Sequence, residues 1–381
     1  MIHLAYKDIR HTLGKFLVTA MGVGMLLGIV LIMIGVYRGM IIDAQVLLDD
    51  TGADLWIVQD GTMGPFAEAS RIHEDLKNSL RVIDGIDRTA ALTFQNLQLP
   101  YHKAHLRVVA VGYDPYVSPA PLDPTRLIAG RPLARDHYEM VVSEKLAIPV
   151  GTRITLGRNR YTVVGITHGT VSSGGDPLIY LSLKDAQELQ FLYANPRIRN
   201  DRARGLHTAN AHMVNAVIAT LRPGCDPQHI AREIRRWKHL SVYTQRQQRD
   251  ILTHNLIKMA SKQIGMFTVI LVIVSTIIIA LIIYTMTLEK MKEIAIMKLI
   301  GIPNMTIIRM IGEETLLLGV VAFLFANLFA HAIYDSFPKR VVLERPDAWM
   351  LFVVVLVASV LASISGIRKV IQADPAAAIG G

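Results

Sequence analysis

The sequence contains a single cysteine, Cys225, among its 381 residues. A disulfide within the chain is therefore excluded, and so are metal and redox motifs built from paired cysteines. It has no G-x-x-x-x-G-K-[ST] motif, which argues against ATP binding through a P-loop. The G-x-S-x-G and H-E-x-x-H motifs of hydrolases and zinc proteases are also missing. We therefore expect no cofactor or metal, and a protein that is not itself an enzyme.

Acidic residues are fewer than basic ones: the sequence has 31 Asp and Glu against 40 Lys and Arg, so its formal net charge is +9. No nucleic-acid recognition motif accompanies the basic residues, so we expect no nucleic-acid partner. The excess is typical of membrane proteins with basic cytoplasmic flanks. It also reflects the Arg-rich segment 196–207. We interpret that segment as a solvated loop, or alternatively as a contact patch for an acidic partner or lipid head groups.

Long apolar runs, in contrast, are plentiful. Each of four runs has the ~20 residues that a helix needs to cross a bilayer. A helix also satisfies its backbone polar groups internally, as the hydrocarbon requires. The first run is too long for a signal-peptide core, and no cleavage site follows it. The sequence predicts four transmembrane helices, at 16–37, 264–288 (the end of a longer helical stretch), 315–334 and 349–367.

Basic residues near the ends of these runs predict the orientation. They precede the first run, lie between the second and third, and follow the fourth, so these flanks are expected in the cytoplasm. The loop 335–348 also carries basic residues, which weakens the asymmetry there. We expect a membrane protein with both ends, 1–15 and 368–381, in the cytoplasm and with the segment 38–244 on the outer side of the membrane.

The segment between the first two runs has the alternating strand and helix patterns of a mixed α/β domain, which we expect to form two lobes. Predicted strands include 53–60, a hairpin formed by 88–100 and 105–114, and a second hairpin within 152–168. Predicted helices include 66–80 and 226–237, the latter with Asp226 as N-cap. The segment 177–190 is predicted as a strand followed by a helix that Ser182 caps. From Gln245 a helical pattern runs into the second apolar run, which predicts a stalk that forms one helix with that span, 245–288.

Small residues recur at every fourth position of the first run. Such a strip lets another helix approach closely, either within the bundle or in a dimer. Two carboxylates precede the third run, where they would complement the dipole of a helix that begins there. The residues of these two predictions are Ala20, Gly24 and Gly28 for helix packing, and Glu313 and Glu314 for the helix start.

Few polar side chains interrupt the runs. Asn327 and His331 lie one turn apart in the third run, and we favour an inter-helix hydrogen bond or a position near the interface over a functional site. His102 and His105 have i, i+3 spacing, but no carboxylate is near them and their segment is a predicted turn. We therefore do not predict a metal site there.

The short segment 289–303, between the second and third runs, is charged but not cleanly amphipathic. Its charged residues alternate around a helix with Ile294, Met297 and Ile300. A helix lying on lipid would separate its two faces. We therefore expect a cytoplasmic helix packed between its own spans and a protein partner. Gly301 fits a C-cap, and Pro303 prevents continuation.

Here the sequence resembles a family. The stretch MKEIAIMKLIGIPNMTIIRMIGEETLLLG, 291–319, is similar to the coupling segment of MacB/FtsX-type (type VII) ABC transporter permeases. Ile302 and Pro303 depart from the usual pattern. IAGRPL, VVSEKLA, YTVVGI and DPAAAI resemble further family segments, and ADLWIVQDGTMGPFAE resembles the DevC-like branch. The matching coupling residues are Glu293, Ile294, Ala295, Lys298 and Gly301, with Glu314 beyond them.

The resemblance implies a homodimer bound to two copies of a separate ATPase, which would bind the ATP. The coupling helix would sit in a groove of that ATPase, and ATP-driven movement would pass through stalk helices to the external domain without a central substrate channel. The resemblance also implies a bacterial inner (cytoplasmic) membrane, with the segment 38–244 in the periplasm. A periplasmic adaptor and an outer-membrane duct would complete an efflux assembly. The expected coupling residues are Lys292, Glu293, Ile294, Ile296, Met297, Lys298 and Gly301.

Two other roles stay open. An FtsX-like transmembrane signaller would activate a cell-wall hydrolase, and a LolC- or LolE-like subunit would release lipoproteins from the membrane. A neighbouring gene for an adaptor or a hydrolase, or co-purifying lipidated protein, would distinguish these roles. The sequence does not indicate the cargo.

Overall fold

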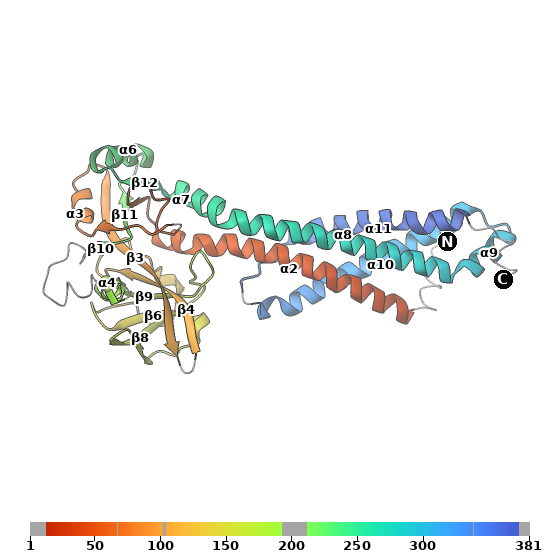
Figure 1. Cartoon of the computed structure of the whole chain (residues 1–381), viewed down its shortest axis with the longest axis horizontal. Helices are drawn as coiled ribbons and strands as arrows, with labels where there is room; N and C mark the ends of the chain where they lie inside the picture. The colour runs from red at the N-terminus through yellow and green to blue at the C-terminus, as the bar shows by residue number, and fades with distance from the viewer. Residues whose placement is uncertain (1–12, 67, 102–103, 193–211, 338, 373–381) are drawn as a thin grey trace. The chain divides into compact units, whose positions relative to one another are not determined.

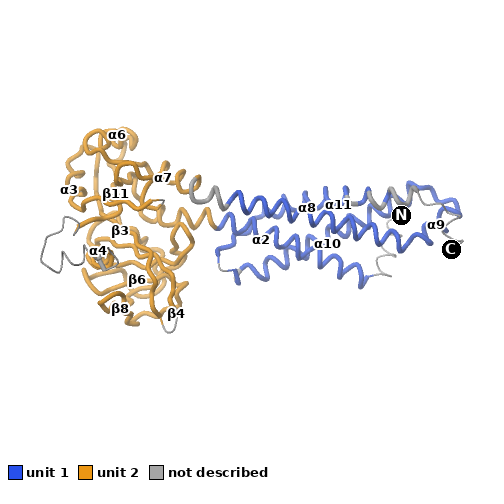
Figure 2. The backbone as a smooth tube through the Cα atoms, viewed as in Figure 1, with its two compact units in different colours: residues 1–39, 260–381 blue, residues 40–259 orange. Residues whose placement is uncertain are grey.

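The structure, a computed structural model, describes residues 13–372 with gaps at 67, 102–103, 193–211 and 338. The chain divides into two compact units, which we treat separately: unit 1 comprises 1–39 and 260–381, and unit 2 comprises 40–259 (Figure 2). The basic segment 196–207, the DPAAAI segment and His102 lie outside the described residues.

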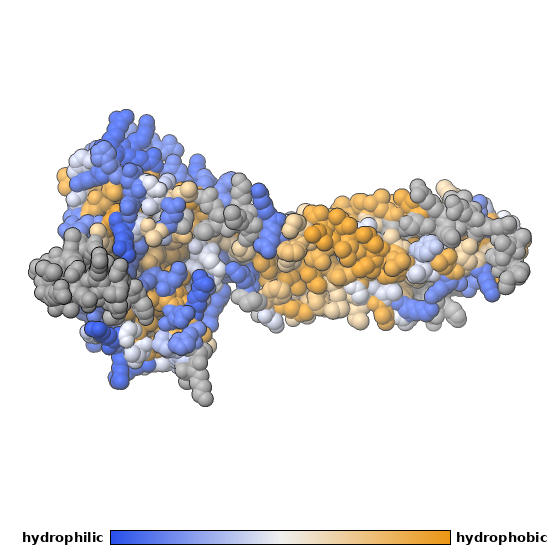
Figure 3. Space-filling model, viewed as in Figure 1, coloured by the Kyte–Doolittle hydropathy of each residue, from blue (hydrophilic) through white to orange (hydrophobic). Residues whose placement is uncertain are grey.

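Unit 1 is helical. Three of its described helices are long and apolar enough to cross a membrane: Leu13–Thr51, Ser261–Glu289 and Asn304–Ile333. The fourth predicted span, 349–367, lies within another helix of this unit, and the count of four spans and their orientation stay predictions. On the face shown in Figure 3, apolar side chains gather over the helices of this unit. The helices are α2 (Leu13–Thr51), α8 (Lys258–Glu289), α9 (Met291–Leu299), α10 (Asn304–Ile333) and α11 (Arg345–Gln372) (Figure 1).

The start of α10 corrects the sequence prediction. The helix begins at Asn304, directly after Pro303, whose backbone is extended. Glu313 and Glu314 therefore lie well inside the helix, with no acidic residue in its first turn. Because the helix dipole acts mainly on the first turn, the predicted dipole role of these two carboxylates is wrong. The apolar run marked only the most hydrophobic part of a longer helix.

The helical path from Gln245 is not uniform. The chain runs from α7 (Gln245–Ile251) through a π-helical segment, Leu252–Ile257, into α8. Thr244 and Gln247 form a capping box at the start of α7. Such π segments widen the helix locally and often occur at functional sites.

The described residues of unit 2 contain one long sheet, and the expected division into two lobes stays a prediction. The strand order of this sheet is β12-β1-β11-β3-β4-β9-β6-β8-β5, with β7 paired to β8 and a separate β2–β10 pair. The first part of β3 pairs with β11, and the second part pairs with β4. The strands are β1 (Leu55–Val58), β2 (Ile72–His73), β3 (Ile86–Tyr101), β4 (Ala104–Tyr113), β5 (Leu127–Gly130), β6 (Glu139–Ser143), β7 (Arg153–Leu156), β8 (Asn159–Thr167), β9 (Leu178–Ser182), β10 (Met213–Val214), β11 (Ala216–Leu221) and β12 (Ser241–Thr244).

Local signals predicted several of these elements correctly. β3 pairs with β4 and β7 with β8, as the two predicted hairpins require. The carboxylate of Asp226 accepts the N–H of Gln228 at the start of α6 (Pro227–Lys238). α4 (Leu183–Leu192) follows β9, and the Asp185 N–H donates to Ser182 Oγ.

The predicted helix 66–80 is mostly wrong. Of the described residues in this range, which exclude 67, only those of α3 (Leu76–Leu80) are helical. Ile72 instead pairs with Val214 in the β2–β10 pair, and Ser70 Oγ accepts the N–H of Gln59. These long-range contacts override the local helical preference.

Three segments that carry the family resemblance meet at one edge of the sheet, because β5, β6 and β8 are neighbours. A Cβ on Gly130 would lie 2.2 Å from the Val164 carbonyl oxygen, and one on Gly165 would lie 2.4 Å from that of Arg131. The glycines thus permit a close backbone crossing. Arg131 forms a bidentate ion pair with Glu139, at 2.5 and 3.0 Å.

That ion pair predicts an acid-dependent stability. The hydrogen bond from Arg131 lowers the pKa of Glu139 below its ordinary value of 4.5. Its stabilising contribution is therefore present above pH 4.5 and lost as the pH falls through the lower, folded-state pKa. We expect E139Q to cost about 1–3 kcal/mol at pH 7 and to flatten the acid-side decline in thermal stability of the detergent-solubilised chain. D84N, at an exposed carboxylate, is the control, and equal curves for E139Q and wild type would refute the assignment.

Candidate functional site

The predicted coupling segment forms a short helix with defined ends. α8 ends at Glu289, and Lys290 separates it from α9. At the other end, Gly301 has a φ of +89°. The N–H of Ile302 donates to the Met297 carbonyl, and that of Gly301 to the Lys298 carbonyl, both at 3.0 Å. This is a Schellman motif, so the prediction that Gly301 ends the helix is confirmed.

One side of α9 is anchored in unit 1. Ile294 and Ala295 are each 1% exposed. Ile294 belongs to the same apolar cluster as Ile283 of α8 and Ile307 of α10. Burial of such a side chain contributes about 1.5–3 kcal/mol. The family-matching Ile294 therefore holds the helix in place and is not available to a partner.

The other side of α9 is open, and we call it the docking face. Ile296 is 50% exposed, Leu299 61%, and Ile300 75%. Apolar groups of this size, mixed with charges, are typical of surfaces that a protein covers. Met297 and Lys298 are half-buried. The docking face consists of Lys292, Glu293, Ile296, Leu299 and Ile300, together with Met305 in the first turn of α10.

Leu299, Ile300 and Met305 were absent from the predicted coupling residues. The turn at Gly301 and Pro303 could have identified these three residues, because they lie directly beside the point where the chain reverses. Apolar residues that flank a helix stop cannot all face the same core.

The small-residue strip packs inside the chain. A Cβ on Gly24 would lie 2.7 Å from the carbonyl oxygen of Ala322, and one on Gly28 would lie 2.7 Å from the ring of Phe329. Ala20 is fully buried. α10 thus occupies this face of α2, and a dimer contact stays a prediction that would need another face.

The two carboxylates before the third apolar run have different surroundings. Glu313 Oε1 accepts from Arg309 Nε at 2.9 Å in an exposed pair. Glu314 Oε1 accepts from Lys290 Nζ at 2.7 Å, with both side chains largely buried. Only the second pair joins the coupling segment to a membrane helix.

The polar side chains of Asn327 and His331 in α10 find hydrogen-bond partners within their own helix. Asn327 Nδ2 donates to the Phe323 carbonyl at 3.4 Å, and His331 Nδ1 lies 2.9 Å from the Asn327 carbonyl oxygen. Both partners lie one turn earlier in the same helix. The structure therefore shows bonds within one helix in place of an inter-helix bond, and the alternative that we gave, a position near the membrane interface, stays a prediction.

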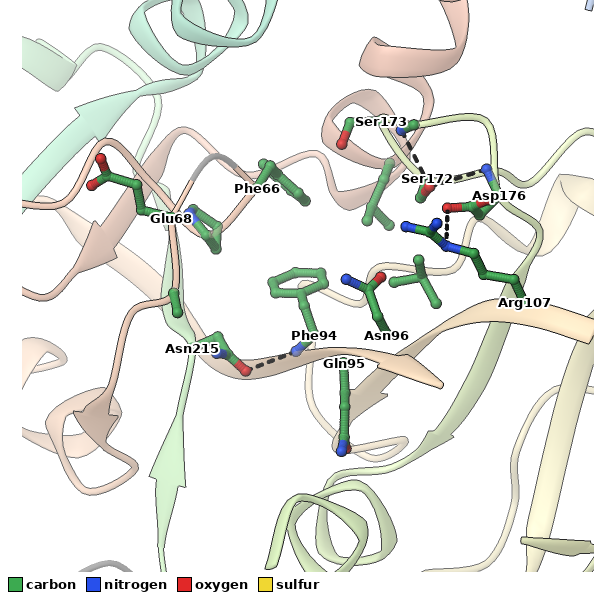
Figure 4. Close-up of a pocket in the computed structure, with 15 residues that line it drawn as sticks. Phe66, Glu68, Phe94, Gln95, Asn96, Arg107, Ser172, Ser173, Asp176 and Asn215 are labelled. Atoms are coloured by element: carbon green, nitrogen blue, oxygen red, sulfur yellow. Dashed lines mark hydrogen bonds and ion pairs between the residues drawn. The ribbon is translucent and has the colours of Figure 1, made fainter. Parts of the chain in front are cut away.

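Unit 2 contains a pocket of about 370 Å³ (Figure 4). The rings of Phe66 and Phe94 form one wall, with centroids 5.1 Å apart. The Arg107–Asp176 ion pair, at 3.3 Å, lies at the other end, and Gln95 points away. Asn215 braces the wall, since it accepts the Phe94 N–H and donates to the Ser70 carbonyl. Sequence reasoning missed this pocket because its residues come from separate segments.

Comparison with known proteins covers nearly the whole chain. The profile of the MacB-like periplasmic core domain matches residues 16–237, and that of the FtsX-like permease C-terminal region matches 265–375. The uncharacterized ABC transporter permease Rv2563 of Mycobacterium tuberculosis is 23% identical over 100% of both chains. The putative hemin transport system permease protein HrtB of Staphylococcus haemolyticus is 20% identical, covering 100% of this chain and 99% of that one.

Among solved structures, the periplasmic region of MacB from Actinobacillus actinomycetemcomitans is 10% identical. The match covers 51% of this chain and 89% of that one, with a TM-score of 0.36. The two family profiles together span both units, in the order that the coupling segment and the sheet motifs led us to expect. The chain therefore belongs to the MacB/FtsX-type family of ABC transporter permeases.

Proposed function

We propose that this permease subunit transmits ATP-driven movement of a separate ATPase to its own extracytoplasmic domain, as part of an exporter. The observation that carries the proposal is the two-sided character of α9. Ile294 anchors the helix in unit 1, while Ile296, Leu299 and Ile300 stay exposed. A helix held on one side and open on the other can receive a load from a partner and pass it to the helices beside it.

The mixture of apolar and charged side chains on the docking face supports the same role. The docking face combines exposed apolar side chains with Lys292 and Glu293. Apolar groups supply binding energy, whereas charges set partner choice and register. A groove on an ATPase that is apolar at its base and charged at its rim would match this face.

The proposed assembly is a homodimer with two ATPase copies in the inner membrane, and with the domain formed by unit 2 in the periplasm. A periplasmic adaptor and an outer-membrane duct would complete the export path. The FtsX-like and LolC-like roles use the same transmission step, and no contact in the described residues favours either over export. Identification of the proteins that co-purify from native membranes would separate the three.

The docking face yields a direct test. We expect I296E to reduce recovery of the ATPase with the tagged permease at least about tenfold, because loss of a central interface anchor costs about 2 kcal/mol or more and each ~1.4 kcal/mol is tenfold in affinity. Recovery is measured after solubilisation from membranes in which both proteins are made. V82E is the matched control, since Val82 of unit 2 is 84% exposed.

The I296E chain should elute in size-exclusion chromatography as wild type does, because residue 296 faces outward. If I296E and V82E retained equal amounts of ATPase, α9 would not be the docking element.

A further inference from the structure

The turn between α8 and α9 contains a buried ion pair that the coupling prediction did not include. Lys290 Nζ lies 2.7 Å from Glu314 Oε1, and the two side chains are only 12% and 11% exposed. The partners are 24 residues apart along the chain. The pair thus joins the junction between two helices to the middle of a third.

The surroundings of the ion pair are mostly apolar, with Thr287 and Thr315 as the polar neighbours of Glu314. Phe16 of α2, Ile283 of α8 and Ile311 of α10 line a small cavity of about 10 Å³ beside Glu314. Phe16 is 2% exposed. Removing two charges from water at such a place costs free energy. The attraction between the charges offsets this desolvation cost only when their geometry is good. A buried pair is therefore poor evidence for stability alone and is more readily explained by the register that it enforces.

The pair differs from the other contact that holds α9. Ile294 packs among apolar side chains, and such contacts are non-directional. A charge-assisted hydrogen bond is short and directional, so it holds its partners in one register. Lys290 also supplies the carbonyl that accepts the Ile294 N–H, at 2.9 Å. Displacement of α9 therefore displaces Lys290 and, through the ion pair, α10.

We propose that Lys290 and Glu314 are positioning residues that lock α9 to α10, so that force on the docking face moves α10 together with α8. The inference rests on the proposed function, because it assumes that an ATPase docks on α9. The ion pair would give a second mechanical connection from α9 to the membrane helices. Movement of α9 would act on α8 through the backbone and on α10 through the ion pair.

The test uses the full chain in its complex with the co-purified ATPase, in lipid nanodiscs. We measure the ATPase rate in the complex relative to the isolated ATPase. E314Q and K290M should leave ATPase recovery within about twofold of wild type. They should change the relative rate at least about fivefold, the lower end of usual coupling effects. E313Q is the matched control, because Glu313 is adjacent but pairs with Arg309 in the open.

Two double variants distinguish a positioning role of the ion pair from a purely stabilising role. The charge swap K290E/E314K should restore the wild-type rate ratio, because it keeps a directional bond. The apolar pair K290M/E314L should keep the thermal midpoint close to that of wild type, since buried ion pairs are often replaceable by packed apolar groups. It should still fail to restore the rate ratio.

The possible outcomes test ATPase docking and the ion pair separately. If wild type recovers no ATPase, the proposed function fails. If the complex forms and E314Q behaves as E313Q does, only the ion-pair inference is overturned. A wild-type rate ratio in K290M/E314L would also overturn it, because the pair would then serve packing alone.

Discussion

Replacing Gly39 with alanine is expected to destabilise unit 1 by about 3 kcal/mol or more, a severe effect for one methyl group. An added Cβ would lie 1.9 Å from the carbonyl oxygen of Arg340 and 2.7 Å from its carbonyl carbon. Backbone atoms at such distances must move. The measurement is the thermal midpoint of the detergent-solubilised chain.

The loop that carries Arg340 has little freedom to retreat. The Val342 N–H donates to the Gly35 carbonyl at 3.0 Å, one turn before Gly39. Arg38 holds the far end of the loop through Glu344 at 2.5 Å and Asp347 at 2.7 Å. These bonds hold the loop against α2 in the residues that follow Arg340, so the loop cannot relieve the strain by a small shift away from Gly39.

Gly22 provides the control on the same helix. An added Cβ there meets nothing within 4 Å, and alanine is the better helix former by about 1 kcal/mol. G22A should therefore match or slightly exceed wild type. Equal losses in G22A and G39A would show that the glycines matter for helix flexibility and not for the close approach of the loop.

Replacing Thr253 with proline is expected to abolish transmission through the stalk while leaving the ATPase bound. Proline removes a backbone donor and clashes with the preceding turn, at a cost of about 3 kcal/mol in a helix interior. Thr253 lies in the π-helical segment between α7 and α8. The readout is the nucleotide-dependent change in mobility of a spin label at V82C in unit 2, in a C225S background.

T253A is the matched variant. It removes only the hydrogen bond from the hydroxyl to the Arg249 carbonyl, at 2.9 Å, and should keep the nucleotide response. A T253P complex with a wild-type response would contradict transmission through this segment, whatever its effect on stability.

Features set by neighbouring residues could be predicted from the sequence. Gly301 and Pro303 end one helix and begin the next through their own backbone preferences, and Asp226 caps α6 through a bond two residues away. The hairpin of β3 and β4 follows from alternation and a short turn. Each of these signals lies within a few positions of the element that it determines.

Features set by distant residues could not be predicted in the same way. The strip around Gly24 is visible in the sequence, but its partner, α10, depends on how the bundle packs. Glu314 was noticed for its place before an apolar run, and its burial against Lys290 required the helix to begin at Asn304. The pocket beside Phe94 needs six separate segments to converge.

The most direct test of transmission measures the extracytoplasmic domain while the ATPase changes state. Spin labels at V82C in a C225S background, one per protomer of the proposed dimer, report the distance between the two copies of unit 2 in nanodiscs. We predict that the distance distribution shifts between the nucleotide-free complex and a complex trapped with ATP by a hydrolysis-deficient ATPase. Superimposable distributions, in a complex shown to bind ATP, would contradict the account.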